Sequence, residues 1–182
     1  MYLNEILEEL GDGPPPRVAV LDDDRSSVLV IDRLLIHGGY RVSAFTAPDR
    51  FLASIGEHEP DAICLDLHVP GYEEVGILEA VRKQVPGVPV IMLTADDHPS
   101  SVVASMKAGA FDYVTKPVDR ERLLLTVGHA VKQRRLAERL HSLEHPATGR
   151  RFGGVYGRSS TMLELFRQLD GATGSDVPVL LQ

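Results

Sequence analysis

The chain has few of the residues that cross-link a protein or anchor it in a membrane. Its 182 residues include no tryptophan and one cysteine, and only 5% are aromatic. A single cysteine cannot form an internal disulfide, so we expect Cys64, inside the apolar run 62–65, to pack as a small hydrophobic side chain. No run approaches the roughly 18 apolar residues that span a membrane, and the acidic amino terminus is unlike a signal peptide. We therefore expect a cytoplasmic protein.

Positive charge is also scarce overall. The formal net charge is −7, which argues against the whole chain binding nucleic acid. Basic residues gather in 132–151, where we expect them to solvate a linker helix; nucleic-acid contact by this stretch is the alternative. An apolar content of 43% is enough for a core, and the length predicts one domain or one and a half.

Short β-rich runs alternate with amphipathic stretches between residue 17 and about residue 145. We expect strands at 18–21, 42–45, 62–65, 88–93 and 113–115, and helices at about 27–37, 48–55, 75–84, 99–107 and from near Asp119. Pro48 and Pro99 suit the first turn of a helix, whereas Gly109 suits a helix end. Apolar strands that alternate with helices predict an α/β fold, in which helices cover both faces of a parallel sheet.

The two ends of this region carry further helical patterns. Residues 1–10 place four apolar side chains at helical spacing, which predicts a short amphipathic helix, with a frayed tail as the alternative. The last helix is expected to continue to Leu143, about 37 Å at roughly 1.5 Å per residue. Leu136, Leu140 and Leu143 follow coiled-coil spacing. This stripe predicts a homodimer through the linker helix; packing on the chain's own tail is the alternative.

Carboxylates follow two of the predicted strands. Asp22 and Asp23 come after 18–21, and Asp66 comes after 62–65. Ligands of open α/β sheets bind at the carboxyl ends of the strands, so we expect these side chains to converge. Two unit charges 4 Å apart repel by about 4 kcal/mol at an effective dielectric of 20, which calls for a proton or a cation between them. Oxygen ligands of this kind suit Mg²⁺. The alternative role, capping a helix, is favoured only for Asp24.

Lys116 and Thr94 end two further strands. Lys116 can place a positive charge on a phosphoryl group or on the carboxylate of Asp66. A cis peptide at Pro117, which the sequence does not decide, would turn this lysine inward. The hydroxyl of Thr94 could hydrogen-bond a phosphoryl oxygen on Asp66. A surface lysine and a strand-end threonine are the alternatives, but together with the acids these residues predict a phosphoryl-accepting site.

Four segments carry a family resemblance: 21–24 (LDDD), 65–71 (LDLHVPG), 93–95 (LTA) and 115–117 (TKP). They resemble the receiver domain of two-component response regulators over roughly residues 17–130. The resemblance implies a doubly wound, flavodoxin-like parallel sheet of five strands in the order 2-1-3-4-5. It also implies that Asp66 accepts phosphate from a sensor histidine kinase with the help of Mg²⁺, and that the chain is a signalling domain rather than an enzyme.

The same resemblance implies roles for the surrounding residues. Asp23, the carboxylate of Asp66 and the main-chain carbonyl of His68 would bind Mg²⁺, with Asp22 acting through water. Thr94 and Tyr113 would form a switch pair, in which Thr94 moves toward the phosphate and Tyr113 fills the vacated space. Two residues depart from the usual pattern of the family. Glu74 replaces the usual glycine, and the ring of His68 could reach the water that attacks the phosphoaspartate.

A second, shorter resemblance lies at the end of the chain. Residues 152–159 and 177–182 are similar to the opening of the AAA+ domain in sigma-54-dependent activators of the nitrogen-regulator type. The glycine-rich phosphate loop of that family does not appear, so no ATP hydrolysis is expected of this chain. The predicted organisation is an extension (1–16), a receiver (17–130), a linker helix (131–148) and an AAA+ fragment (149–182). The alternatives are a phosphorylation-independent dimerisation module and a Mg²⁺-dependent phosphohydrolase with Asp66 as nucleophile.

Overall fold

The computed structural model describes the backbone of residues 14–72, 75–95, 99–144, 150–152 and 155–157, and the side chains of 14–72, 75–95 and 101–140. The predictions for residues 1–13, for Glu74, for the side chain of Leu143 and for the segment 158–182 lie outside these residues. The chain divides into two compact units, Met1–Leu136 and Ala137–Gln182. Each unit is described by itself.

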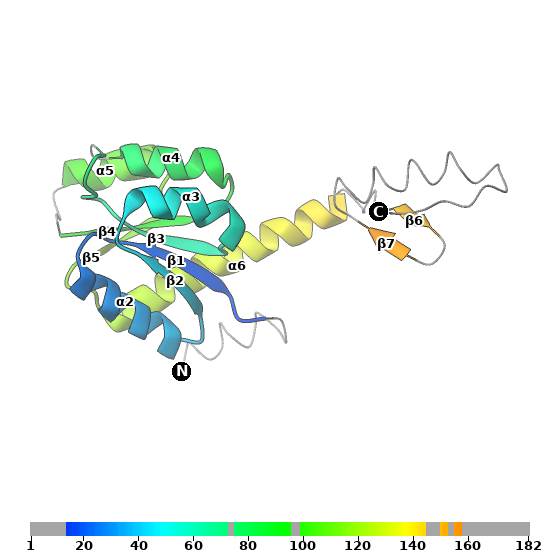
Figure 1. Cartoon of the computed structure of the whole chain (residues 1–182), viewed down its shortest axis with the longest axis horizontal. Helices are drawn as coiled ribbons and strands as arrows, with labels where there is room; N and C mark the ends of the chain where they lie inside the picture. Colours follow the sequence, from blue (N-terminus) through cyan, green and yellow to red (C-terminus); the bar gives the residue numbers. More distant parts are fainter. Residues whose placement is uncertain (1–13, 73–74, 96–98, 145–149, 153–154, 158–182) are drawn as a thin grey trace. The chain divides into compact units, whose positions relative to one another are not determined.

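The first unit contains a parallel sheet of five strands in the order β2-β1-β3-β4-β5 (Figure 1). The strands are β1 (Arg17–Leu21), β2 (Arg41–Phe45), β3 (Ala62–Asp66), β4 (Val90–Thr94) and β5 (Asp112–Thr115). This confirms the predicted fold and strand order. β4 begins at Val90 rather than at residue 88, because Pro89 has no N–H to give the sheet; its carbonyl instead accepts from the amide of Ile63 at 3.0 Å.

Helices cover both faces of the sheet and form two cores. They are α2 (Arg25–His37), α3 (Pro48–His58), α4 (Gly76–Gln84), α5 (Pro99–Lys107) and α6 (Arg120–Glu144). α2 and α6 cover one face, where Ile31, Leu35, Leu123 and Val127 pack on Val20 and Cys64. α3 and α4 cover the other, where Phe51, Ile55, Ile77 and Leu78 pack on Ile63 and Leu65. Cys64 is buried, as the sequence predicts.

Local chemistry explains where several helices begin and end. The carboxylate of Asp24 accepts hydrogen bonds from the amides of Ser26 and Ser27, both at 3.1 Å, so the predicted N-cap of α2 is confirmed. Asp119 likewise accepts from the amide of Arg122 at 2.9 Å and caps α6. α3 continues three residues past the predicted end at residue 55 and stops where Glu59 takes a left-handed conformation, with φ 44°.

α6 is a continuous helix of 25 residues that ends at Glu144, one residue past the predicted end at residue 143. Leu136 and Leu140, one turn apart on this helix, are 48% and 58% exposed. In the second unit, β6 (Arg150–Phe152) and β7 (Val155–Gly157) form an antiparallel pair that the sequence patterns did not predict. Among the described residues, no helix has the length and apolar character needed to cross a membrane.

Candidate functional site

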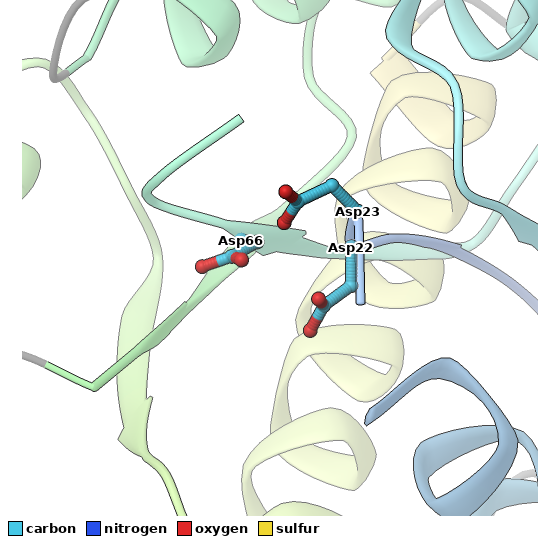
Figure 2. Close-up of side chains that lie close together, drawn as sticks. All are labelled: Asp22, Asp23 and Asp66. Carbon is cyan, nitrogen blue, oxygen red and sulfur yellow. The ribbon is translucent and has the colours of Figure 1, made fainter. Parts of the chain in front are cut away.

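Three carboxylates meet where the strand order of the sheet reverses. Asp22 and Asp23 follow β1 and Asp66 ends β3, and these two strands are neighbours. One carboxylate oxygen from each aspartate lies within 4.8 Å of the other two, and Figure 2 shows the three side chains gathered at the strand ends. Asp22 and Asp66 are buried whereas Asp23 is exposed. The sequence prediction that these acids converge is therefore supported by their geometry.

Lys116 joins two of these carboxylates. Its Nζ lies 2.7 Å from Oδ2 of Asp22 and 3.0 Å from Oδ2 of Asp66. The Lys116–Pro117 peptide bond is cis. The amide of Lys116 also donates to the carbonyl of Thr94 at 2.7 Å, which ties the end of β5 to the end of β4. The sequence predicted the contact with Asp66; it did not predict the shorter contact with Asp22.

Backbone amides hold the other carboxylate oxygen of Asp22 and of Asp66. The amide of Asp24 donates to Oδ1 of Asp22 at 3.0 Å. The amide of His68 donates to Oδ1 of Asp66 at 3.3 Å, a long bond. Both donors lie two residues after the aspartate that they contact, in the turn that follows its strand. The loops thus orient the carboxylates, and a pattern of residue types does not reveal such bonds before the loop conformation is known.

Burial and charge act in opposite directions on the pKa values of this cluster. Burial raises the pKa of the Asp22 carboxyl, and the hydrogen bonds from Lys116 and from the amide of Asp24 offset that effect only in part. Burial alone would lower the pKa of the Lys116 ammonium, but its hydrogen bonds to Asp22 and Asp66 and their charges raise it overall. The raised pKa of Asp22 shows that its negative charge is held at a cost, and the raised pKa of Lys116 shows that a cation beside it is favoured.

The other predicted site residues lie around this cluster. Thr94 ends β4 and is 2% exposed. Side chains alternate between the two faces along a strand, so Thr94 and Met92, which are two residues apart on β4, lie on the same face. Met92 pairs with Tyr113 in the β4–β5 ladder, so all three side chains project to the α3–α4 face of the sheet. Tyr113 is half-buried in the core on that face, and the side chain of His68 is exposed. The predicted switch pair therefore shares one face of the sheet.

The oxygen donors of this site fit a magnesium ion. Mg²⁺ takes oxygen ligands, keeps several waters and is commonly held by one or two carboxylates. Asp23, which is exposed, and Asp66 offer such oxygens at neighbouring strand ends. Asp22 already contacts Lys116, which suits a contribution through water rather than a direct bond.

An open, doubly wound parallel sheet that gathers three carboxylates and a lysine at its carboxyl edge defines a class of protein: α/β domains with an acidic site at the topological switch point. Residues 18–128 match the family described as response regulator receiver domain. The chain belongs to this family, which serves as the receiver of two-component systems.

Curated relatives extend the similarity beyond the receiver. The chain is 28% identical over 166 residues to the DNA-binding transcriptional regulator NtrC of Salmonella typhimurium, covering 90% of this chain and 34% of NtrC. It is 32% identical over 130 residues to the regulatory protein LuxO of Vibrio cholerae, covering 71% of this chain and 28% of LuxO. The chain thus spans about a third of the length of the curated relatives it matches.

Solved structures show the same fold. The receiver domain of the Francisella response regulator 1452 matches with a TM-score of 0.60 and 29% identity, over 65% of this chain and 98% of that one. NtrX from Brucella abortus, solved in complex with ADP, matches with a TM-score of 0.66 and 23% identity, over 87% of this chain and 34% of that one. At this identity the second match supports the fold alone.

Proposed function

We propose that Asp66 accepts a phosphoryl group from a sensor histidine kinase in a Mg²⁺-dependent reaction. The observation that carries this proposal is the position of Lys116, whose ammonium contacts Asp66 at 3.0 Å beside the carboxylates of Asp22 and Asp23. A carboxylate oxygen of Asp66 attacks the phosphorus of the phosphohistidine, a P–O bond forms and the P–N bond breaks. The released imidazole keeps the electron pair of that bond and takes up a proton.

The surrounding residues have distinct roles in this proposal. Asp23, the carboxylate of Asp66 and the carbonyl of His68 would hold Mg²⁺, with Asp22 acting through water; a bound ion would supply positive charge to the phosphoryl oxygens. Lys116 supplies a further positive charge. Thr94 hydrogen-bonds the new phosphoryl group, and Tyr113 takes up the space that Thr94 leaves on the same face of the sheet. Phosphorylation then shifts a population between two packings.

A small phosphodonor tests the acceptor directly. Incubation with acetyl phosphate and Mg²⁺ should add one phosphoryl group to the protein, which intact-mass spectrometry detects. The adduct should be absent from Asp66→Asn and from samples with excess chelator. Asp49→Asn, which alters an exposed aspartate in the first turn of α3, is the matched control and should be labelled like the parent. Equal labelling of the parent and Asp66→Asn would show that another residue is the acceptor.

We further propose that the output passes through α6, which joins two copies of the chain in a homodimer. Leu136 and Leu140 are exposed at i, i+4 spacing on one helix, as in the seam of a coiled coil. The proposed organisation is a receiver (17–130), a linker helix (131–148) and, from 149, the start of an AAA+ domain of a sigma-54-dependent activator. The similarity to NtrC over 90% of this chain supports it.

Sedimentation velocity tests this output. The parent protein should change its dimer affinity when Mg²⁺ and beryllofluoride, a phosphate mimic on aspartate, are added. Leu140→Asp should be monomeric in both states, whereas Arg139→Asp, which adds the same acid on the adjacent exposed residue, should still dimerise. A dimer whose affinity does not respond to beryllofluoride would favour a phosphorylation-independent dimerisation module.

A further inference from the structure

Helix α5 is the next element after β4, which ends at Thr94, and its described side chains bury little apolar surface. Among its described side chains (101–107), Ser105 alone is fully buried, and its hydroxyl donates within the helix to the carbonyl of Ser101 at 2.9 Å. Val103 and Met106 are 49% and 43% exposed. Because buried apolar side chains usually hold a short helix in place, α5 depends on other contacts for its position.

The carboxyl end of α5 is capped by its own backbone. Gly109 adopts a left-handed conformation with φ +92°. Its amide donates to the carbonyl of Met106, and the amide of Ala110 donates to the carbonyl of Ser105, both at 3.0 Å. This pattern satisfies the terminal carbonyls of a helix. The amide of Phe111 then donates to the carbonyl of Val90 at 2.7 Å, so the sheet holds the chain just after the helix.

Arg82, in the last turn of α4, reaches this same end of α5. Its Nη1 donates to the carbonyl of Ala108 at 2.6 Å. The guanidinium lies against Gly109, where the Cβ of any other residue would occupy the position of Nη1. A cation beside the last carbonyls of a helix is favoured by the helix dipole. The left-handed backbone favours glycine at residue 109, and the absence of a Cβ leaves room for the guanidinium in this position.

α4 and α5 each follow a strand of the acidic site. α4 follows β3 and the loop after Asp66, and α5 follows β4 and Thr94. We propose that Arg82 is the tether of a hinge: it holds the carboxyl end of α5 on α4, so that a change at Thr94 moves the amino end of α5 about a stationary carboxyl end. Arg82 is thus a positioning residue. This inference rests on the proposed function, because phosphorylation of Asp66 supplies the change at Thr94.

Two fluorine probes on α5 test the hinge. Val103→Cys and Lys107→Cys place exposed thiols one turn apart on the same side of the helix, and the native Cys64 is buried and does not compete for labelling. Each variant is labelled with a trifluoromethyl reagent and followed by ¹⁹F NMR as Mg²⁺ and beryllofluoride are added. The signal at residue 103 should shift on addition, whereas the signal at residue 107 should stay in place.

Removing the tether should release the second probe. In Arg82→Met, which keeps an unbranched apolar stem, both signals should shift. Arg82→Lys, whose ammonium can still donate to Ala108, should return the signal at residue 107 toward its stationary behaviour. Lys83→Met removes the neighbouring exposed cation on the same turn and should behave like the parent. Equal shifts of both probes in the parent, or a stationary signal at residue 107 in Arg82→Met, would overturn the hinge.

Hydrogen exchange separates the tether from the phosphorylation chemistry. Without any phosphate mimic, Arg82→Met should speed exchange of the amides of Gly109 and Ala110 by about threefold, the effect of losing one solvent-exposed hydrogen bond from a charged group, and Lys83→Met should not. Unchanged exchange would overturn the tether. Hydrogen exchange could confirm the tether while beryllofluoride fails to raise the melting temperature of the parent. The proposed function would then be wrong, and the hinge could not respond to phosphorylation.

Discussion

Nζ of Lys116 lies 2.7 Å from Oδ2 of Asp22, although β5 and β1 are separated in the sheet by β3 and β4. The contact forms because both residues follow the carboxyl ends of their strands and the lysine side chain is long enough to cross the intervening ends. The Asp22 side chain is 0% exposed and that of Lys116 is 19% exposed. Each charge is tolerated there because the other is present, so the pair is a sensitive point of the fold.

Replacing Lys116 by methionine should destabilise the protein by roughly 3 kcal/mol at neutral pH in chelator, because the carboxylates of Asp22 and Asp66 then lose their cation. Urea denaturation measures the free energy of unfolding. Lys107→Met, at an exposed lysine, is the control and should lie within about 0.5 kcal/mol of the parent. Added Mg²⁺ should recover part of the loss, since the ion supplies positive charge. An unchanged stability of Lys116→Met in chelator would contradict the role of the pair.

Alkaline pH should weaken the same pair. The bonds and charges of Asp22 and Asp66 raise the pKa of Lys116 above its ordinary value of 10.5, despite the opposing effect of burial. A group whose pKa is raised by folding contributes stability that is complete below the unfolded-state pKa and disappears as the pH rises through the folded-state value. The stability advantage of the parent over Lys116→Met should therefore be constant below pH 10.5 in the alkaline range and shrink above it. Urea titrations on both sides of that pH measure this stability advantage. An advantage that persisted undiminished above pH 10.5 would refute the ion pairing of Lys116 with the two aspartates.

Asp22→Asn tests the cost of burying a carboxylate. Burial raises the pKa of Asp22 above its ordinary value of 3.8. The folded protein then binds more protons than the unfolded chain between that value and the raised pKa, so stability falls as the pH rises through this window. Asparagine does not titrate. The stability of Asp22→Asn relative to the parent should therefore increase from acidic pH toward neutrality, as followed by urea denaturation in chelator. A relative stability that decreased over this range would show that Lys116 outweighs burial.

The regular part of the structure follows from local chemistry in the sequence. Apolar runs bounded by turns located the five strands of the sheet, and Asp24 and Asp119 marked helix starts because their side chains accept from the amides two or three residues later. The strand order came from the resemblance to receiver domains. The errors are also physical: α3 runs three residues past its expected end, through Gly56, and stops where Glu59 takes a left-handed conformation.

The contacts that the sequence did not predict join side chains from distant elements. The acids were expected to converge because strand ends share one edge of the sheet, but the bond between Lys116 and Asp22 depends on how far a side chain reaches across two strands. Gly109 was expected to end a helix, and it does; that it also makes room for Arg82 depends on the position of α4. Such contacts require the packed structure, since neither periodicity nor spacing encodes them.

Tyr40 provides a test of the core beneath α6, far from the charged residues of the site. Its side chain packs with Leu35, Cys64 and Leu124, and the residue is 4% exposed. Within the described part of the chain its hydroxyl has no hydrogen-bond partner, and burial raises its pKa to about 12. A buried hydroxyl without a partner costs free energy that the phenyl ring of phenylalanine does not.

Tyr40→Phe should therefore stabilise the protein by about 1 kcal/mol, because the ring keeps its packing while the unsatisfied hydroxyl is removed. Urea denaturation should show a higher midpoint with an unchanged slope, since the surface exposed on unfolding stays the same. Tyr72→Phe, at a half-buried tyrosine of the opposite core, is the matched control and should change stability by less than about 0.5 kcal/mol. A less stable Tyr40→Phe would mean that the hydroxyl is hydrogen-bonded in solution, with a buried water as the simplest partner.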